Sequence, residues 1–428
     1  MDHHSRSLQR NPASRPFLFA TGLECSYPMI KGPDGKQLRR DEYAETHHYQ
    51  RWEEDFELVK SLGLSVLRYG PPYHKVHHGP GRYTWDFVDE TFGRLKKLGI
   101  APIADLCHFG VPDWLESFQN PDWPPYFAEY ARAFARRYPW VEMFTPVNEI
   151  YVAASFSARK GLWNEQLSSD HAFVTAVKHM AQATLLAEAA ILQVNPGAVF
   201  VQSEATSYYH AQSPDALRRT HRLNEMRFLS LDLCYGVEIS ALMYRYLRDH
   251  GMKREEYEWF MNSARSVVPA CVMGNDYYAM NEHLVPAGEG PLEPAGVVYG
   301  YYILTRQYYE RYHMPVMHTE TNQLGAQHSA ETWLRNMWLN VLKLLEDGVP
   351  LVGFTWYSLV DQVDWDTALV QNNGHVNPVG LFDLDRKERV VGGHYGHLLR
   401  TWGPMMARES RRLDTQLLED AHQSAGQV

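Results

Sequence analysis

Two glutamates follow apolar, β-prone runs at widely separated places in the chain. Glu149 stands behind Asn148 in FTPVNEIYVAA (144–154), and Glu320 stands in PVMHTETN (315–322). A charge at the end of a buried strand is costly unless it is paired or used. Two carboxyl groups that face each other can cleave a glycosidic bond, because one protonates the leaving oxygen and the other attacks the anomeric carbon. This pair is therefore the first candidate for catalytic chemistry.

Short β-prone runs alternate with longer amphipathic segments along the chain. The expected strands are 17–25, 65–70, 101–108, 141–149, 198–205, 271–278, 315–322 and 351–359. The helices expected after them are 53–63, 85–99, 124–138, one within 170–194, 215–233, 299–313, 330–348 and one near 394–402. Buried parallel strands that alternate with helices are typical of α/β proteins. These eight pairs predict a closed (β/α)8 barrel, with the length beyond roughly 250 residues placed in loops.

A doubly wound open sheet is the alternative architecture. It would need a glycine-rich phosphate-binding turn after its first strand, and the chain contains neither G-x-G-x-x-G nor a Walker loop. The nearest segment, GEGPLE (288–293), lacks the third glycine. We therefore expect one barrel domain at 17–405, preceded by a disordered arm (1–16) and followed by a polar tail (406–428).

The composition disfavours several classes of function. The 428 residues are 45% hydrophobic and carry a net charge of −10, which supports a large core and disfavours nucleic acid as a partner. The four cysteines lack C-x-x-C spacing and the histidines form no H-E-x-x-H motif, so neither a metal site nor a disulfide framework is expected. No apolar run of about eighteen residues and no signal sequence occurs. We expect a soluble cytoplasmic protein with no membrane partner and no cofactor.

In such a barrel, catalytic groups lie at the C-terminal ends of the strands. The residues at these positions are Glu24, Arg68, His108, Asn148, Glu149, Glu204, Asp276, Tyr278, Glu320, Trp356 and Tyr357. We interpret Glu204 as a polar support of the crater floor rather than a third catalytic carboxylate. Glu149 and Glu320 end the fourth and seventh strands, so they should face each other across the crater. A separation of about 5–5.5 Å favours cleavage with retention, and one above roughly 6.5 Å favours inversion.

The motifs TPVNE, HTETN, WYSLVDQVDW and NPVGLFDLDRKERVV carry a further signal. They resemble glycoside hydrolase family 1, the β-glucosidase-like retaining enzymes with a (β/α)8 barrel, over nearly all of residues 17–402. The likeness is greatest to a short bacterial branch, through LRYGP, YPWVEMFTPVNE and NPGAVFVQSEA. The resemblance implies a hydrolase that releases a non-reducing-end β-linked sugar from a small glycoside or oligosaccharide. The reaction would be a double displacement through a covalent glycosyl-enzyme.

The resemblance also implies roles for the two glutamates and their neighbour. Glu149 matches the acid/base of the family, and Glu320 matches its nucleophile. Asn148 would hydrogen-bond the sugar 2-hydroxyl, a contact that strengthens in the transition state.

Three more residues receive supporting roles from the same resemblance. Arg68 would hold Glu320 ionised, because a cation within about 4–6 Å favours a carboxylate. Tyr278 would donate a hydrogen bond to the same carboxylate. His108 would contact a sugar hydroxyl.

The chain departs from the family pattern around the sugar. The family glutamate that grips the 4- and 6-hydroxyls aligns with Asp364, one methylene shorter, and Trp365 matches its neighbour. The tryptophan floor aligns with Tyr357 rather than Trp356. The family's sugar-bridging glutamine has no clear match, and Glu24 is the nearest polar candidate. We therefore expect a different glycone, or one that is held differently.

Several alternatives stay open. The loop DTALVQNNGHVNP (366–378) contains no lysine, which disfavours a 6-phosphorylated sugar. A transglycosidase would use the same intermediate, and a non-catalytic carbohydrate-binding barrel would lack one carboxylate or its arginine. Both glutamates and Arg68 are present, which favours an enzyme. Glycone, linkage and oligomeric state are not specified by these motifs.

Overall fold

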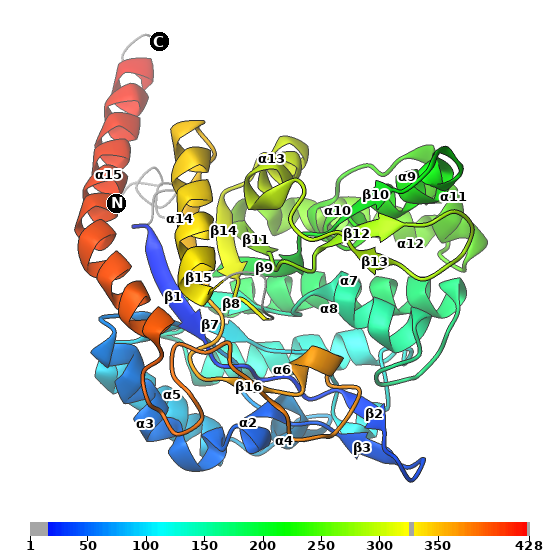
Figure 1. Ribbon diagram of the computed structural model, residues 1–428, viewed down its shortest axis with the longest axis horizontal. Coiled ribbons are helices and arrows are strands. Elements are labelled where there is room, and N and C mark those ends of the chain that lie inside the picture. The colour runs from blue at the N-terminus through cyan, green and yellow to red at the C-terminus, as the bar shows by residue number, and fades with distance from the viewer. Residues whose placement is uncertain (1–15, 325–328, 426–428) are drawn as a thin grey trace.

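A closed barrel of parallel strands lies at the centre of the molecule (Figure 1). The computed structural model describes residues 16–324 and 329–425. The barrel strands are β1 (Leu18–Gly22), β4 (Val66–Tyr69), β7 (Ala101–Asp105), β8 (Met143–Thr145), β9 (Val199–Ala205), β11 (Cys271–Asp276), β14 (Val316–Glu320) and β15 (Leu351–Trp356). They follow one another around the ring in chain order, and β15 pairs with β1 to close it. The predicted (β/α)8 fold is confirmed.

Helices surround the barrel and are present where the amphipathic segments predicted them. They are α3 (His48–Ser61), α5 (Asp86–Leu98), α6 (Trp123–Arg137), α8 (Asp170–Val194), α9 (Leu217–Met226), α10 (Leu229–Tyr235), α13 (Gly300–Tyr312), α14 (Ala330–Glu346) and α15 (Val390–Ala425). Local chemistry sets their ends. Ser169 accepts a hydrogen bond from the Ala172 N–H at the start of α8, and Gly99 ends α5 with φ of 67°.

The barrel interior is packed with apolar side chains. Ala20, Val66, Ile103, Met143, Val199, Val201, Val272, Met317 and Val352 form one buried cluster contributed by all eight strands. A larger core lies between the strands and the helices. Burial of both faces explains why the strand segments read as near-continuous apolar runs.

Short elements extend the loops between the barrel units. Those near the first two strands and on the loop after β15 are β2 (Met29–Lys31), β3 (Gln37–Arg39), α2 (Glu42–Glu45), α4 (Tyr73–Val76), β5 (His77–Gly79), β6 (Arg82–Tyr83), β16 (Gln362–Val363) and β17 (Val376–Asn377). Those after β8, β9 and β11 are α7 (Ile150–Ala154), β10 (Tyr208–Ala211), α11 (Ala241–Asp249), α12 (Arg254–Ser263), β12 (Glu282–Val285) and β13 (Glu293–Pro294). β10, β12 and β13 form a small separate sheet, which Figure 1 shows to one side of the barrel with α9, α11 and α12.

The last helix is longer than the one expected near residues 394–402. A polar tail was expected from residue 406, but α15 continues as one helix from Val390 to Ala425, with Pro404 inside it. Polar composition alone therefore did not mark the end of this helix. The expected arm at 1–16 lies almost wholly outside the described residues. No helix within the described ranges has both the length and the apolar composition that crossing a membrane requires.

Candidate active site

The fourth and seventh strands bring the two glutamates to the same rim. Glu320 is the last residue of β14, and Glu149 lies just beyond β8 as the residue before α7. The Asn148 N–H donates to the Cys107 carbonyl at 2.9 Å, and the Glu149 N–H donates to the Ser203 carbonyl at 3.0 Å. These bonds extend the strand pairing beyond β8 and hold both residues in place. A carboxylate oxygen of Glu149 lies within 4.8 Å of one of Glu320.

Glu320 receives two side-chain donors. Arg68, from the end of β4, donates through Nη1 to Oε1, and the Tyr278 hydroxyl donates to Oε2 at 2.7 Å. Arg68 also donates through Nη2 to Asp105 at 3.1 Å and to Asn148 Oδ1 at 2.9 Å. Burial, followed by the Glu320 charge, raises the pKa of Tyr278 well above its usual value, so the phenol keeps its proton. Both donors favour a charged carboxylate at Glu320.

Glu149 has different surroundings. It is 8% exposed, and its side chain accepts no hydrogen bond from the residues that the structure describes. Burial, Asp276 and Glu320, in that order, raise the pKa of Glu149 well above its usual value. The raised pKa favours the protonated form of Glu149, which is the form that a general acid requires.

Asp276 joins the pair as a third carboxyl group. It ends β11, is fully buried, and offers an oxygen within 4.8 Å of Glu149 and Glu320 oxygens. Burial raises its pKa most, the Glu320 charge raises it further, and Arg68 lowers it. The sequence placed Asp276 at a strand end but gave it no role. Its position at the end of the sixth strand, between those of Glu204 and Glu320, was the signal that could have singled it out.

A second network lies beside Arg68. The ring nitrogens of His108 lie 2.8 Å from Asp105 Oδ2 and 3.3 Å from Glu24 Oε1. The Asn148 amide nitrogen lies 3.1 Å from His108 Nε2. Burial lowers the pKa of His108, but Asp105 and Glu24 more than offset this and raise it well above its usual value. His108 is 1% exposed, so its contact with a sugar hydroxyl stays a prediction.

Glu24 and Glu204 are both buried but have different partners. Glu24 accepts from Ser26 and, through Oε2, from Gln362 at 3.1 Å. Glu204 accepts from the Tyr151 N–H at 3.1 Å and from the Ser230 hydroxyl at 2.7 Å. Burial raises the pKa of Glu204 to about 7. These contacts tie β9 to α7 and α10, and the interpretation of Glu204 as a support of the crater floor stays a prediction.

The two aromatic residues at the end of β15, Trp356 and Tyr357, have different surroundings. Trp356 is fully buried, and its indole N–H donates to the Val379 carbonyl at 3.0 Å. The Tyr357 ring packs against Gly22, and the Arg68 guanidinium carbon lies 5.2 Å from the centre of that ring. Tyr357 is thus the member of the pair that lies near Arg68, and its role as the floor of the sugar site stays a prediction.

Asp364 does not fit its expected role as the group that grips sugar hydroxyls. Arg40 Nη2 donates to its Oδ2 at 2.9 Å, and the N–H groups of Asn373, Gly374 and His375 donate to its two oxygens at 2.8–3.0 Å. The side chain is fully buried. The carboxylate therefore organises its own loop, and we correct the prediction. The sequence could not show that Arg40 competes for this group.

The indole N–H of Trp365, the residue after Asp364, is unpaired among the described residues. Its ring centre lies 6.0 Å from that of Phe109 and 6.4 Å from that of Trp163. The indole N–H is buried and has no hydrogen-bond partner among the described residues. It is available to donate to a bound ligand, so its sugar-binding role stays a prediction.

A (β/α)8 barrel that carries paired carboxyl groups at the strand ends has the architecture of a glycoside hydrolase. The model of glycosyl hydrolase family 1 matches residues 34–255, more than half of the chain, and the chain belongs to this family. It is therefore a glycoside hydrolase, and its substrate is a carbohydrate. Glu149 lies within the matched range, and Glu320 lies outside it.

Named relatives agree with this assignment. β-Glucosidase A of Thermotoga maritima is 22% identical over 400 residues, covering 83% of this chain and 87% of its own. The 6-phospho-β-glucosidase AscB of Escherichia coli (strain K12) is 24% identical over 384 residues, covering 78% and 80%. A solved structure of the Thermotoga maritima β-glucosidase with deoxynojirimycin matches with a TM-score of 0.74 at 19% identity, covering 90% and 97%. This structural likeness shows the shared fold.

Proposed function

We propose that this protein is a retaining β-glycosidase that releases one sugar from the non-reducing end of a small glycoside or oligosaccharide. The observation that supports this proposal is the distance between the carboxylate oxygens of Glu149 and Glu320, which is within 4.8 Å. Retaining enzymes have carboxyl groups about 5–5.5 Å apart, whereas inverting enzymes leave room for a water molecule.

The reaction proceeds in two displacements. In the first, a Glu320 oxygen forms a bond to the anomeric carbon, and the glycosidic oxygen leaves with the proton of Glu149. In the second, Glu149 accepts a proton from water, the water oxygen bonds to the anomeric carbon, and the bond to Glu320 breaks. The enzyme ends with Glu149 protonated and Glu320 ionised, as it began.

The surrounding residues have roles that follow from their contacts. Arg68 and Tyr278 stabilise Glu320 as the carboxylate before attack and after release. Asn148, whose oxygen is held by Arg68, directs its amide group to the sugar 2-hydroxyl.

Four described cysteines are free and buried, and we place the protein in the cytoplasm on that basis.

We propose an unphosphorylated glycone. The loop 366–378 contains neither lysine nor arginine, and the nearby Arg40 is already paired with Asp364 and Glu45. A panel of aryl β-glycosides should therefore be cleaved faster than the 6-phosphoglucoside. Faster cleavage of the phosphorylated substrate would contradict this choice.

The stereochemistry tests the mechanism. Proton NMR during hydrolysis of an aryl β-glycoside should show the β-anomer of the free sugar first, with the α-anomer appearing later by mutarotation. An α-anomer formed first would exclude double displacement. Adding a sugar acceptor separates hydrolysis from transglycosylation, because a transglycosidase would give mainly the coupled product.

A further inference from the structure

Asp276 is the third carboxyl group of the catalytic rim, and the proposed function leaves it without a task. The Ser203 hydroxyl donates to its Oδ2 at 2.6 Å. Its Oδ1 is buried and has no hydrogen-bond partner among the residues that the structure describes. A buried carboxylate with one unpaired oxygen is poorly stabilised, whereas a protonated carboxyl group loses much less on burial.

The neighbouring charges further disfavour an ionised Asp276. The titratable and charged groups that face Asp276 are Glu149, Glu320, Arg68, Tyr278 and, from α13, Tyr301. Arg68 is the one fixed cation of this set, and its guanidinium already donates to Glu320, Asp105 and Asn148. A second anion beside Glu320 therefore has no cation of its own, and carboxyl groups this close do not both ionise readily.

We propose that Asp276 stays a neutral carboxylic acid while Glu320 is ionised, and that it thereby keeps the catalytic pair in its working protonation state. This inference rests on the proposed function of Glu149 and Glu320. Asp276 is a positioning residue. Its neutral carboxyl group adds no negative charge beside the pair.

Asp276→Asn tests the proposal through the direction of a pH shift. The amide has the shape of the neutral acid and cannot ionise. We expect kcat/KM at the optimum to stay within about tenfold of the native value. The basic limb of the pH–rate profile should stay in place or move to higher pH, because one group whose ionisation inactivates the enzyme has been removed.

An ionised Asp276 would shift the pH–rate profile of the Asp276→Asn variant in the opposite direction. If Asp276 is ionised in the working enzyme, the amide removes a negative charge beside Glu149 and Glu320. Both limbs of the profile would then move to lower pH by about one unit or more, and the proposal would be wrong. Glu188→Gln is the matched control, because Glu188 is a buried carboxyl 3.9 Å from Cys271, at the other end of β11. Its profile should be unchanged.

A spectroscopic measurement does not depend on activity. The infrared carboxyl band of protonated acids should lose intensity in Asp276→Asn relative to the native enzyme near neutral pH. An unchanged band would overturn the proposal, as would activity that EDTA abolishes and a divalent cation restores. Failure of the proposed function would appear instead in the anomer that NMR detects first, so the two failures are distinguishable.

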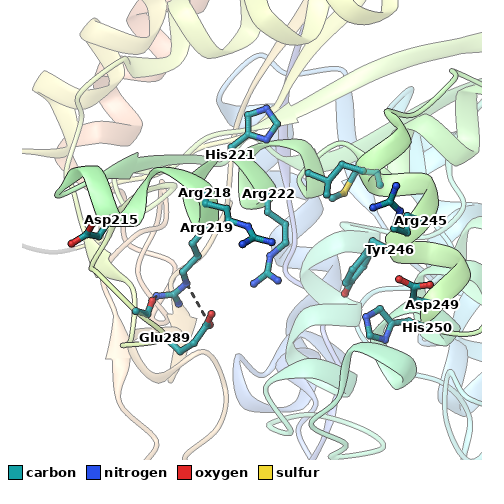
Figure 2. A pocket seen from close by; sticks show the side chains of 13 residues that line it. Asp215, Arg218, Arg219, His221, Arg222, Arg245, Tyr246, Asp249, His250 and Glu289 are labelled. Atoms are coloured by element: carbon teal, nitrogen blue, oxygen red, sulfur yellow. Dashed lines mark hydrogen bonds and ion pairs between the residues drawn. The ribbon is translucent and has the colours of Figure 1, made fainter.

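A second inference comes from a separate cavity of about 620 Å³, to which none of the rim residues described above contributes (Figure 2). It lies between α9, α11 and the loop after β12. Its basic residues are Arg218, Arg219, His221, Arg222, Arg245 and His250, and its acidic residues are Asp215, Asp249 and Glu289.

Most arginines of this cavity lack a partner. Arg219 donates to the carbonyls of Gly288 and Gly290 at 2.9 and 2.8 Å. Arg218, Arg222 and Arg245 form no hydrogen bond or ion pair within the described part of the chain, and the Arg222 Nε is buried without a partner. Figure 2 shows Arg218 and Arg222 extending from α9, on which they stand four residues apart. Like charges four residues apart on a helix repel.

We infer that this cavity binds the phosphate or sulfate group of a ligand. Guanidinium groups match the planar faces of such oxyanions and bind them through paired hydrogen bonds. A bound oxyanion would also remove the repulsion between Arg218 and Arg222. Within the described part of the chain, no acidic residue of the wall forms an ion pair with the three free guanidinium groups.

Calorimetric titration tests this site with inorganic phosphate, inorganic sulfate, glucose 6-phosphate and glucose. We expect the anions to bind; tighter binding of glucose 6-phosphate than of both phosphate and glucose would identify a sugar phosphate as the ligand, because glucose alone measures sugar binding at the catalytic rim. The double variant Arg218→Gln/Arg222→Gln should weaken anion binding at least about tenfold. The control Arg254→Gln/Arg306→Gln removes two arginines outside the cavity, on α12 and α13, each of which pairs with the glutamate four residues later on its own helix. No binding at millimolar anion, or equal binding by both double variants, would overturn the inference.

Discussion

The neighbours of the two buried glutamates have opposite effects on a negative charge there. Glu320 accepts hydrogen bonds from Arg68 and Tyr278, which stabilise a negative charge. Glu149 is surrounded instead by the carboxyl groups of Asp276 and Glu320, which disfavour one. In the proposed mechanism, these different surroundings suit Glu320 to act as the nucleophile and Glu149 as the acid.

Azide rescue should separate the two roles. With an activated aryl leaving group, Glu149→Gly should accumulate a glycosyl-enzyme that azide releases as the β-glycosyl azide. Glu320→Gly cannot form that intermediate, so azide should attack directly and give the α-glycosyl azide. NMR of the products identifies the anomers. The same anomer from both variants would show that the roles are assigned wrongly.

The pKa of Glu149 should change during the reaction. Burial holds it high throughout, but the contribution from Glu320 disappears when Glu320 is bound covalently to the sugar. The pKa of Glu149 should therefore fall in the intermediate, which converts the acid into a base. In the free enzyme, activity should be lost at high pH as Glu149 loses its proton.

Carbon-13 NMR of Glu149, before and after trapping with a 2-fluoro-sugar, measures this change directly. A pKa that is unchanged or higher in the trapped enzyme would contradict the exchange of roles. The result would hold even if both glutamates proved essential.

Among the elements, the ends of β1 and β15 must approach closely to place Tyr357. A side-chain carbon at Gly22 would lie 2.2 Å from the Tyr357 ring, far inside contact distance. Gly22 is therefore required by space, and it fixes the position of a ring that lies over Arg68. The sequence of β1 thus affects the site through a neighbouring strand.

Gly22→Ala should displace Tyr357, lower kcat/KM and destabilise the protein by about 1–3 kcal/mol. Gly93→Ala is the control, because Gly93 lies in α5 and a side-chain carbon there meets nothing within 4 Å. It should be neutral or stabilising by up to about 1 kcal/mol. Urea unfolding and steady-state kinetics measure both effects. Native stability and activity in Gly22→Ala would contradict this account.

At the scale of the whole molecule, the barrel is completed by the helix that follows its last strand. α15 packs against α14, where the rings of Trp338 and Trp402 lie 5.6 Å apart, and Met406 is 9% exposed. Leu398 is also buried. The part of α15 up to Met406 therefore belongs to the core.

Truncation after Ala407 should leave Tm and kcat/KM close to the native values, because it keeps these contacts. We thus retain the proposal that the catalytic domain ends near residue 405, although the helix does not. Truncation after Gly396 removes Leu398, Trp402 and Met406, and it should lower Tm markedly. Thermal unfolding followed by circular dichroism compares the two. Equal losses would show that residues beyond 407 also stabilise the barrel.

Much of this protein follows from its sequence alone. The alternation of strand and helix periodicities determined the eight units, because it depends on each segment's own pattern of apolar residues. The carboxyl ends of parallel strands meet at one rim, so Glu149 and Glu320 could be paired before the structure was known.

Only the tertiary structure decided which other groups share that rim and which are used elsewhere. Asp276 became the third carboxyl of the centre because the fold brings one of its oxygens within 4.8 Å of an oxygen of each glutamate. Asp364 is not available to bind sugar hydroxyls because Arg40, 324 positions earlier in the chain, pairs with its carboxylate. Periodicity specifies which face of an element a side chain occupies. Its partners across the fold depend on distances that no local pattern contains.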